Sequence, residues 1–334
     1  MTVADLDTLG AGDAGPETAV DASGKAITGR SPSSIALSRL RRDKVGMVSA
    51  VVVLLLVLLG VFAPVISKLW GISPVAPKAG DFIEFGYPTI GPPFYPFTWE
   101  HPLGLATGTG TDNLAFLLYG LRTSLIVASI ATLLTTAIGV TIGLIAGYAH
   151  GWLDRGISFI VDTFLSFPFL LGALAIAPIL TSRFATDESK LAQAQFFSLI
   201  AVLTIFGWMG LTRLIRGQVL SLREREFVQA AQVIGVPTRR ILFSELLPNL
   251  IAPIVISISL SLPAYVALEA GLSYLGIGLT GRPSLGQMIL RASESYSQYP
   301  LYLLAPIIVV AVLVLALNLL GDSIRDAFDP RTRQ

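Results

Sequence analysis

The 334-residue sequence contains no cysteine and only two histidines, His101 and His150. Without cysteine the chain can form no disulfide, no thiolate zinc site and no thiol nucleophile. The two histidines lie far apart and do not form the HExxH pattern, in which two histidines on one helix face bind zinc. A metal-centred enzyme is therefore not expected.

Charge is also scarce. Charged residues make up 13% of the chain, whereas a typical soluble domain carries about 25%. The net charge is +1, which is too small to indicate a nucleic-acid partner. This composition indicates that lipid, rather than water, is the main solvent of the chain.

A phosphate-binding loop of the form GxxxxGK[ST] is missing as well. The one Gly-Lys pair, Gly24-Lys25, is followed by Ala26, where the loop needs serine or threonine. The glycine- and threonine-rich stretch 104–110 has no lysine. We therefore expect this chain to hold no cofactor of its own, neither a nucleotide nor a metal.

What the sequence does have is six long apolar runs, within a chain that is 53% apolar. About 20 apolar residues suffice to cross the hydrocarbon core of a bilayer, and backbone groups in lipid must bond within a helix. The first run is too long and begins too late to be a signal peptide. An all-α polytopic membrane protein is predicted, with transmembrane helices over 45–66, 123–148, 157–180, 196–215, 250–270 and 301–320.

The distribution of lysine and arginine predicts the orientation. With the N-terminus in the cytoplasm, sixteen of the 23 basic residues fall on the cytoplasmic side. The remaining seven are spread over the outer loops, including the long loop 67–122. Both termini are therefore expected in the cytoplasm, as an even number of spans requires.

The predicted organisation has five parts. The polar stretch 1–38 is expected to be a disordered cytoplasmic tail. Residues 39–66 hold a basic cluster and the first span, and the proline-rich loop 67–122 is either a connector or a docking cap for an extracytoplasmic partner. Residues 123–321 form the membrane core with a cytoplasmic loop over 219–248, and 322–334 form a cytoplasmic tail.

The cytoplasmic loop 219–248 carries the strongest pattern. Phe227, Ala230, Ala231 and Ile234 fall at i, i+3, i+4 and i+7, which predicts one apolar stripe on a helix. Gly235 stands where a helix should stop. The loop is thus expected to start with a short amphipathic helix.

A second short helix is expected after this stop. Pro237 suits its first turn, Arg239 and Arg240 make it basic, and Pro248 marks the entry to the fifth span. The pair of helices either rests on lipid headgroups or fits a groove on a partner protein.

This loop resembles the EAA loop of the permease subunits of ATP-binding-cassette (ABC) importers, which reads Glu-Ala-Ala, three residues, Gly, and later an apolar residue and Pro. The matching positions are Ala230, Ala231, Gly235, Leu247 and Pro248. Gln229 replaces the usual glutamate, and Glu245 stands where the pattern favours an apolar residue.

Further motifs are similar to those of the C-type permease subunit of oligopeptide and dipeptide importers. They are HPLG at 101–104 with TD at 111–112, YGLRTSL at 119–125, AGY at 146–148 with GWLD at 151–154, EAGLSYLG at 269–276, PSLGQM at 283–288, and the stretch 318–331. The resemblance covers about residues 35–331.

The resemblance implies the type I importer permease architecture, in the inner membrane of a bacterium, and no enzymatic activity in this chain. It also implies a second, B-type permease subunit, two ATPase domains or one fused tandem ATPase that bind ATP and magnesium, and an extracytoplasmic peptide-binding protein. Residues expected to couple to the ATPase are Phe227, Gln229, Ala230, Ala231, Gly235, Arg239, Arg240 and Pro248. Peptides are the expected substrate, with nickel chelates or other small solutes as the alternative.

Two acids and three glycines stand out within the predicted spans. A charge at mid-bilayer costs about 2.5–3.5 kcal/mol, so Asp162 and Glu269 should face the bundle interior or water. Either they lie at an interface with a local partner, or they belong to the transport pathway or its gate. Gly139, Gly143 and Gly147 lie four residues apart, which either allows close helix contact or reflects tolerance of glycine in lipid.

A secondary transporter is the main rival from another class. It would normally show several paired intramembrane charges, or inverted halves broken by glycine and proline, whereas the spans here are mostly uncharged and are expected to be continuous. A membrane-embedded enzyme is less favoured, because the sequence shows no acid–base or metal constellation.

Overall fold

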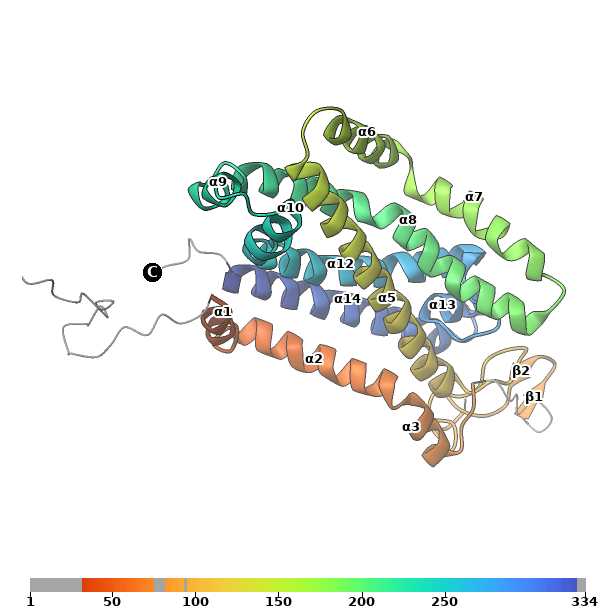
Figure 1. The fold of residues 1–334 in the computed structure, drawn as a ribbon. Helices are drawn as coiled ribbons and strands as arrows, with labels where there is room; N and C mark the ends of the chain where they lie inside the picture. Colours follow the sequence, from red (N-terminus) through yellow and green to blue (C-terminus); the bar gives the residue numbers. More distant parts are fainter. Residues whose placement is uncertain (1–31, 75–81, 93–94, 329–334) are drawn as a thin grey trace, which may run out of the picture.

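The computed structural model describes residues 32–74, 82–92 and 95–328. Within these residues five helices are long and apolar enough to cross a membrane, and a bent pair of helices raises the number of spans to six. The five are α2 (Lys44–Val61), α5 (Asn113–Tyr148), α8 (Glu188–Leu222), α12 (Ile251–Leu272) and α14 (Pro300–Phe328), and the bent pair is α6 (Trp152–Ser166) with α7 (Phe169–Thr181). The predicted all-α fold with six spans is confirmed (Figure 1).

The third span differs from the continuous helix predicted over 157–180. Helices α6 and α7 meet at an angle of 91°. Between them Phe167 has extended backbone angles, with φ −82° and ψ 130°, and Pro168 follows. Proline disfavours the helical conformation in the residue before it and has no N–H for the helix ladder. The Phe-Pro step therefore breaks this span.

The first span is shorter than predicted, and a helix precedes it. After Phe62 a separate helix, α3 (Ala63–Trp70), continues outward. Upstream lies α1 (Pro32–Leu40), so the predicted disordered tail is wrong for residues 32–38. Residues 1–31 lie outside the described part of the chain. Asp43 is the N-cap residue of α2, and its carboxylate accepts a hydrogen bond from the Val45 N–H at 3.0 Å.

Three other helices extend beyond the runs predicted from hydropathy. α5 begins at Asn113, α8 covers 188–222, and α14 continues to Phe328. The predicted tail 322–334 is therefore helical over 322–328, and its last residues lie outside the described ones. Hydropathy marks only the part of a helix that lies in lipid, and these helices project beyond it.

Helices α5 and α8 form the centre of the bundle, and the glycine spacing marks their contact. A Cβ on Gly143 would lie 2.7 Å from Ile215 Cβ, and one on Gly147 would lie 2.6 Å from Val219 Cβ. Both distances are shorter than side chains allow, so only glycine permits this approach. Of the two alternatives left open by the sequence, close helix contact is the one observed.

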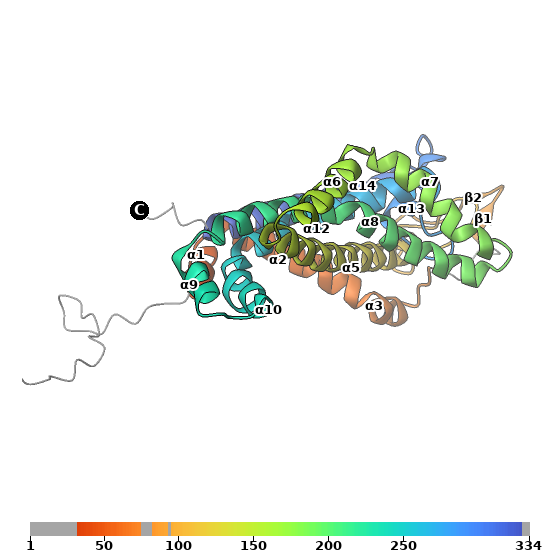
Figure 2. The same ribbon diagram turned by 45° about the horizontal axis from the view of Figure 1, so that its top comes forward.

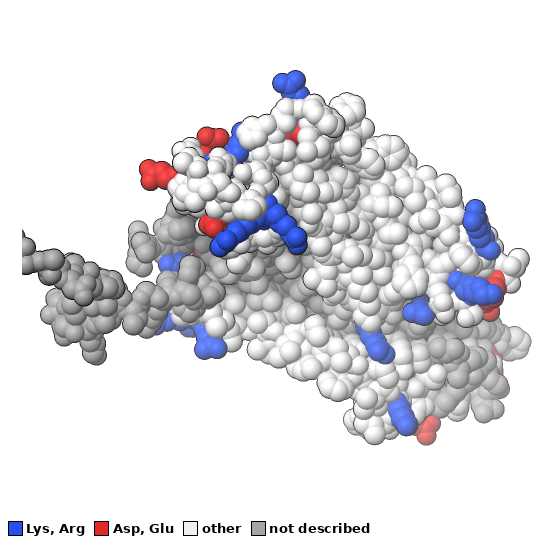
Figure 3. Space-filling view, in the orientation of Figure 1, with Lys and Arg blue, Asp and Glu red and all other residues white. Residues whose placement is uncertain are grey.

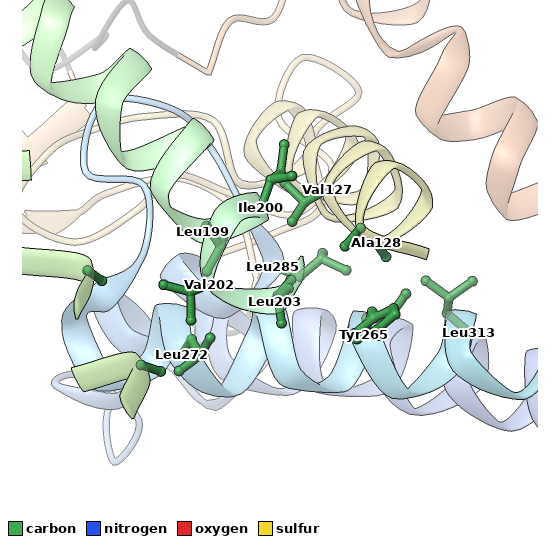
Figure 4. Packing of buried hydrophobic residues seen from close by; sticks show 14 of the residues in the cluster. Val127, Ala128, Leu199, Ile200, Val202, Leu203, Tyr265, Leu272, Leu285 and Leu313 are labelled. Carbon is green, nitrogen blue, oxygen red and sulfur yellow. The ribbon is translucent and has the colours of Figure 1, made fainter. Parts of the chain in front are cut away.

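The hydrophobic core lies where α5, α8, α12 and α14 meet (Figure 4). Its buried side chains include Val127 and Ala128 from α5, Leu199, Val202 and Leu203 from α8, Tyr265 and Leu272 from α12, and Leu313 from α14. Leu285 belongs to α13 (Leu285–Ser293), a short helix that turns back into the bundle between α12 and α14.

The two ends of the bundle are different. At one end lie α1, the end of α14 and the short helices α9 (Glu226–Val233) and α10 (Thr238–Arg240) (Figure 2). At the other end lie α3 and an antiparallel hairpin of β1 (Ile83–Glu84) and β2 (Tyr87–Pro88). Charged side chains gather at these ends and leave a wide uncharged band between them (Figure 3). The end with α1, α9 and α14 is the cytoplasmic one by the lysine and arginine rule, as predicted.

Candidate functional site

The cytoplasmic loop 219–248 is an extension of α8. This helix runs past the predicted end of the fourth span to Leu222, and after a short turn α9 begins at Glu226. Gln229 folds back onto the turn, where its Nε2 donates to the Glu224 carbonyl oxygen at 3.3 Å. The residue that replaces the usual glutamate of the EAA pattern therefore ties α9 to the turn that follows α8.

Gly235 ends α9 as predicted. Its φ is +81°, a left-handed conformation that glycine adopts at little cost. The Gly235 N–H donates to the Gln232 carbonyl and the Val236 N–H to the Ala231 carbonyl, both at 3.0 Å. These two bonds satisfy carbonyl groups that the helix end leaves open.

The predicted second helix is a series of three short segments. Pro237 stands one residue before α10 rather than inside its first turn. A π-helical segment, η2 (Ile241–Leu246), follows, and then α11 (Leu247–Asn249) with Pro248 in its first turn. Pro248 lies three residues before the start of α12 at Ile251, so its predicted place at the entry to the fifth span is correct.

The two faces of α9 have opposite surroundings. Val228 is fully buried in a cluster with Leu144 of α5, Ile215 and Val219 of α8, and Ile241, Leu246 and Leu250. The predicted stripe points the other way, because Phe227 is 41% and Ile234 is 80% exposed, and Ala230 is exposed as well. Of this stripe only Ala231 is partly covered. The role of Val228 was not predicted, because a single apolar position gives no periodic signal.

The outward face of α9 is apolar although it lies at the cytoplasmic end. Val233, which is 88% exposed, extends the surface of Phe227, Ala230 and Ile234. Nearby, Arg239 and Arg240 line a surface hollow of about 500 Å³ together with Pro237, Phe243 and Ser244. A contiguous exposed apolar surface with basic residues beside it is typical of a protein interaction site.

Asp162 does not stand alone in the third span. Its carboxylate pairs with Arg213 of α8, and the two residues line a hollow of about 290 Å³ between α6 and α8. One turn further along α8, Arg216 binds Asp154 of α6 at 2.6 and 2.9 Å. Two ion pairs thus fasten α6 to the part of α8 that leads into α9.

Glu269 is completely buried near the outer end of α12. Its carboxylate accepts hydrogen bonds from Ser124 Oγ of α5 at 2.5 Å and from Ser273 Oγ at 2.8 Å. Ser124 Oγ in turn accepts from the Leu285 N–H at 3.4 Å. In the part of the chain that the structure describes, no basic side chain pairs with Glu269. The residue therefore joins three helices, α5, α12 and α13.

The segment after Glu269 turns back at a glycine. Gly276 lies near the end of the π-helical segment η3 (Ser273–Ile277). Its φ of +86° is not helical, so the helical geometry stops there. Gln195 of α8 then accepts two hydrogen bonds from Thr280, from its N–H and its hydroxyl, both at 2.9 Å. We call residues 273–293 the outer segment; α5, α8 and α12 all hold it. Ser124 lies in the YGLRTSL stretch at 119–125, but nothing in the sequence indicated its partner. Gln195 and Thr280 lie in none of the motifs, and single polar residues carry no periodic signal.

The HPLG and TD motifs of the outer loop have a structural role. His101 Nδ1 lies 2.6 Å from Asp112 Oδ2, and both side chains are buried. The other carboxylate oxygen of Asp112 accepts from the Ala115 N–H at 2.8 Å and caps α5. This pair fixes the start of α5 well before the apolar run begins.

The chain thus combines a bundle of long apolar helices, an outer segment held by three of them, and an exposed helix at the cytoplasmic end. Its fold resembles that of a chain in inward-facing structures of the MetNI methionine ABC transporter, with a TM-score of 0.52 at 20% identity, covering 64% of this chain and 96% of that one. At this identity the likeness shows the fold, that of an ABC importer permease.

The family is shown by the sequence comparisons. The model of the binding-protein-dependent transport system inner membrane component matches residues 139–334, and that of the N-terminal TM domain of oligopeptide transport permease C matches 31–83. The chain belongs to the family of inner membrane components of binding-protein-dependent transport systems. It is accordingly a multi-pass protein of a bacterial inner membrane.

Curated relatives match over nearly the whole chain. The oligopeptide transport system permease protein OppC of Mycobacterium tuberculosis (strain H37Rv) is 32% identical, over 90% of this chain and 95% of its own. The dipeptide transport system permease protein DppC of Alkalihalophilus pseudofirmus is 32% identical, over 92% of both chains. OppC of Bacillus subtilis is 29% identical, over 90% of both.

Proposed function

We propose that this chain forms half of the translocation pathway of a peptide-importing ABC transporter. A second, B-type permease subunit forms the other half, and an extracytoplasmic peptide-binding protein delivers the substrate. ATP and magnesium bind to two ATPase domains, on separate chains or on one fused chain, and this chain contributes no catalytic group. The similarity to oligopeptide and dipeptide permeases over about nine-tenths of the chain supports peptides as the substrate.

The single observation that carries the coupling role is the exposed apolar face of α9. The exposed side chains of this face, on the cytoplasmic side, are those of Phe227, Ala230, Val233 and Ile234. Contact of this apolar surface with water costs free energy, which is regained when a partner covers it. Arg239 and Arg240 lie in the next helix, α10, and line a surface hollow that suits an acidic group of that partner. The partner that this surface fits is the ATPase.

Helix α9 is connected to the membrane helices by several contacts, so a displacement of α9 would move them as well. The buried Val228 ties α9 to α5, η2 and α12 through one cluster. Gln229 and the short turn tie it to α8, and the ion pairs of Asp154 and Asp162 connect α8 to α6. Movement of the ATPase domains would therefore displace α9, α8 and α6 together. Alternating access of this kind needs two arrangements that differ by only a few kcal/mol.

At the outer side, Glu269 is proposed as a gate residue that keeps the outer segment closed. Its hydrogen bonds with Ser124 and Ser273 hold the outer segment against α5. Opening of the gate would exchange these bonds for others. Asp162 is proposed as a pathway-side residue, because its hollow between α6 and α8 is open to the bundle surface.

Reconstitution of the whole complex tests the function. The complete transporter with its binding protein is placed in liposomes, and ATP hydrolysis is measured across a panel of di- to pentapeptides, nickel chelates and other small solutes. Stimulation by peptides, with uptake of the same peptides, is expected. Stimulation by a nickel chelate or another solute alone would replace the peptide assignment, while leaving the importer assignment in place.

A further inference from the structure

A groove on the membrane face of the bundle lies between α2 and α5, which converge toward their outer ends (Figure 1). It has a volume of about 420 Å³ and also reaches Leu262 of α12 and Leu317 of α14. Along α2 it extends from Val53 to Val61, which is about 12 Å at 1.5 Å per residue. Except for Arg122 and Ser129, the lining consists of apolar side chains and one glycine.

Arg122 lies at one end of this groove. A Cβ on Gly60 would be 3.3 Å from Arg122 Cα, so the two backbones touch there. Gly60 is sixteen residues from Lys44, the cytoplasmic start of α2, which is about 24 Å along the helix. Since the hydrocarbon core is about 30 Å thick, Arg122 stands near its outer edge, where lipid phosphates begin.

Arg122 is a partly buried residue. No carboxylate of residues 32–74, 82–92 and 95–328 forms an ion pair with it. A cation in an apolar surrounding is costly unless an anion neutralises it. Phosphate matches the geometry of the planar guanidinium, which can bind it with two parallel hydrogen bonds.

We propose that this groove is a binding site for an acidic phospholipid of the outer leaflet. One acyl chain lies between α2 and α5, and the phosphate pairs with Arg122. A zwitterionic lipid fits less well, because its own ammonium group competes for the phosphate. The bound lipid fills the gap between the first span and the core, so it stabilises the attachment of α2 to the bundle.

Native mass spectrometry of the purified complete transporter tests this site. The probes are phosphatidylglycerol and phosphatidylcholine with the same acyl chains. The wild-type complex is expected to retain phosphatidylglycerol preferentially. Arg122→Gln should weaken this binding by about tenfold or more, which corresponds to roughly 1.4 kcal/mol. Arg183→Gln, which removes an outer arginine away from the groove, is the matched control and should leave binding unchanged.

Two further arms separate the groove from a simple charge effect. Val57→Phe keeps Arg122 but fills the groove, and it should also abolish retention of the lipid. Glycerol phosphate, which has the anion without the acyl chains, should not displace phosphatidylglycerol at equal concentration.

The proposal is overturned by any of five results. These are equal retention of both lipids or no retention by the wild-type complex, unchanged binding in Arg122→Gln, unchanged binding in Val57→Phe, or displacement by glycerol phosphate. The wild-type comparison decides the matter even if a variant fails to assemble. Absence of lipid in the wild type would indicate that a helix of the partner permease covers the groove.

Discussion

At the scale of single residues, Gly235 and Gly217 have opposite requirements. Gly235 has a φ of +81°, and Gly217 lies inside α8 with ordinary helical geometry; a Cβ added to either glycine would meet no atom within 4 Å. The difference between them is therefore conformational and not steric. An L-residue in the left-handed region costs roughly 1–2 kcal/mol, so a methyl group strains the first position and not the second.

Gly235→Ala is expected to weaken coupling while the complex still assembles. The strain lowers the population of the left-handed conformation at residue 235, relative to other conformations of the chain after α9, by a factor of roughly 5–30. Peptide-stimulated ATP hydrolysis in liposomes should fall accordingly. Gly217→Ala is the control and should hydrolyse ATP at the wild-type rate. Equal behaviour of the two variants would show that the angle set by Gly235 does not matter for coupling.

Glu269→Gln is expected to slow peptide uptake by about tenfold. The two serine hydroxyls donate to different oxygens of the carboxylate, and an amide offers only one acceptor oxygen. One serine must therefore reverse its buried hydrogen bond or lose it, and a lost bond costs about 1–3 kcal/mol. The measurement is uptake of a labelled peptide by liposomes of equal transporter content. Glu294→Gln, an exposed acid next to α13, serves as the control. Wild-type uptake by Glu269→Gln would remove the gate proposal.

At the scale of elements, the bent third span depends on α8 for its position. Within the described residues α6 has one buried side chain, Val161, so packing alone holds it weakly. Its ion pairs with Arg213 and Arg216 compensate for this. The pair of Asp154 with Arg216 is the better shielded, with side-chain exposures of 20% and 30%.

A double-mutant cycle measures this attachment. Asp154→Asn and Arg216→Gln, singly and together, are compared by thermal unfolding of the purified complex. A coupling of roughly 1 kcal/mol is expected, at the upper end of values for solvent-accessible pairs. The pair of Asp187 with Lys190, with exposures of 41% and 67%, should couple much less. A coupling near zero for Asp154 and Arg216 would mean that α6 is held by other forces.

The lack of cysteine makes the whole molecule open to a test of its orientation. Single cysteines at Val233 and Phe85 meet no competing thiol, and both positions are highly exposed, at 88% and 100%. In intact cells a membrane-impermeant thiol reagent should label Phe85→Cys and spare Val233→Cys. In inverted vesicles from cells that make this chain without its ATPase subunits, which would cover Val233, the pattern should reverse. Labelling of both from one side would contradict a bundle whose loops 67–122 and 219–248 lie on opposite sides.

The parts of this fold that could be predicted are those that depend on repeated patterns. Six apolar runs indicated the spans, and the spacing of Gly143 and Gly147 allowed a close helix contact without deciding for it. The bend at Pro168 was missed because hydropathy averages over a window and does not register one backbone angle. The contacts of Ser124 and Gln195 were missed for another reason: their partners lie far away in sequence, and only the folded chain brings Ser124 to Glu269 and Gln195 to Thr280.

Helix α8 has a mechanical consequence. Its 35 residues make an unbroken rod about 52 Å long, gripped in its inner half by the glycines of α5. Near the outer end of α8, Gln195 binds the outer segment, and α9 follows the inner end after a short turn. A stiff rod that tilts about a grip between its ends swings those ends in opposite directions. Tilting of α8 about its contact with α5 would therefore release the outer segment while it closes the inner side of the bundle. The two ends would be coupled by the stiffness of one helix, without a chain of side-chain rearrangements between them.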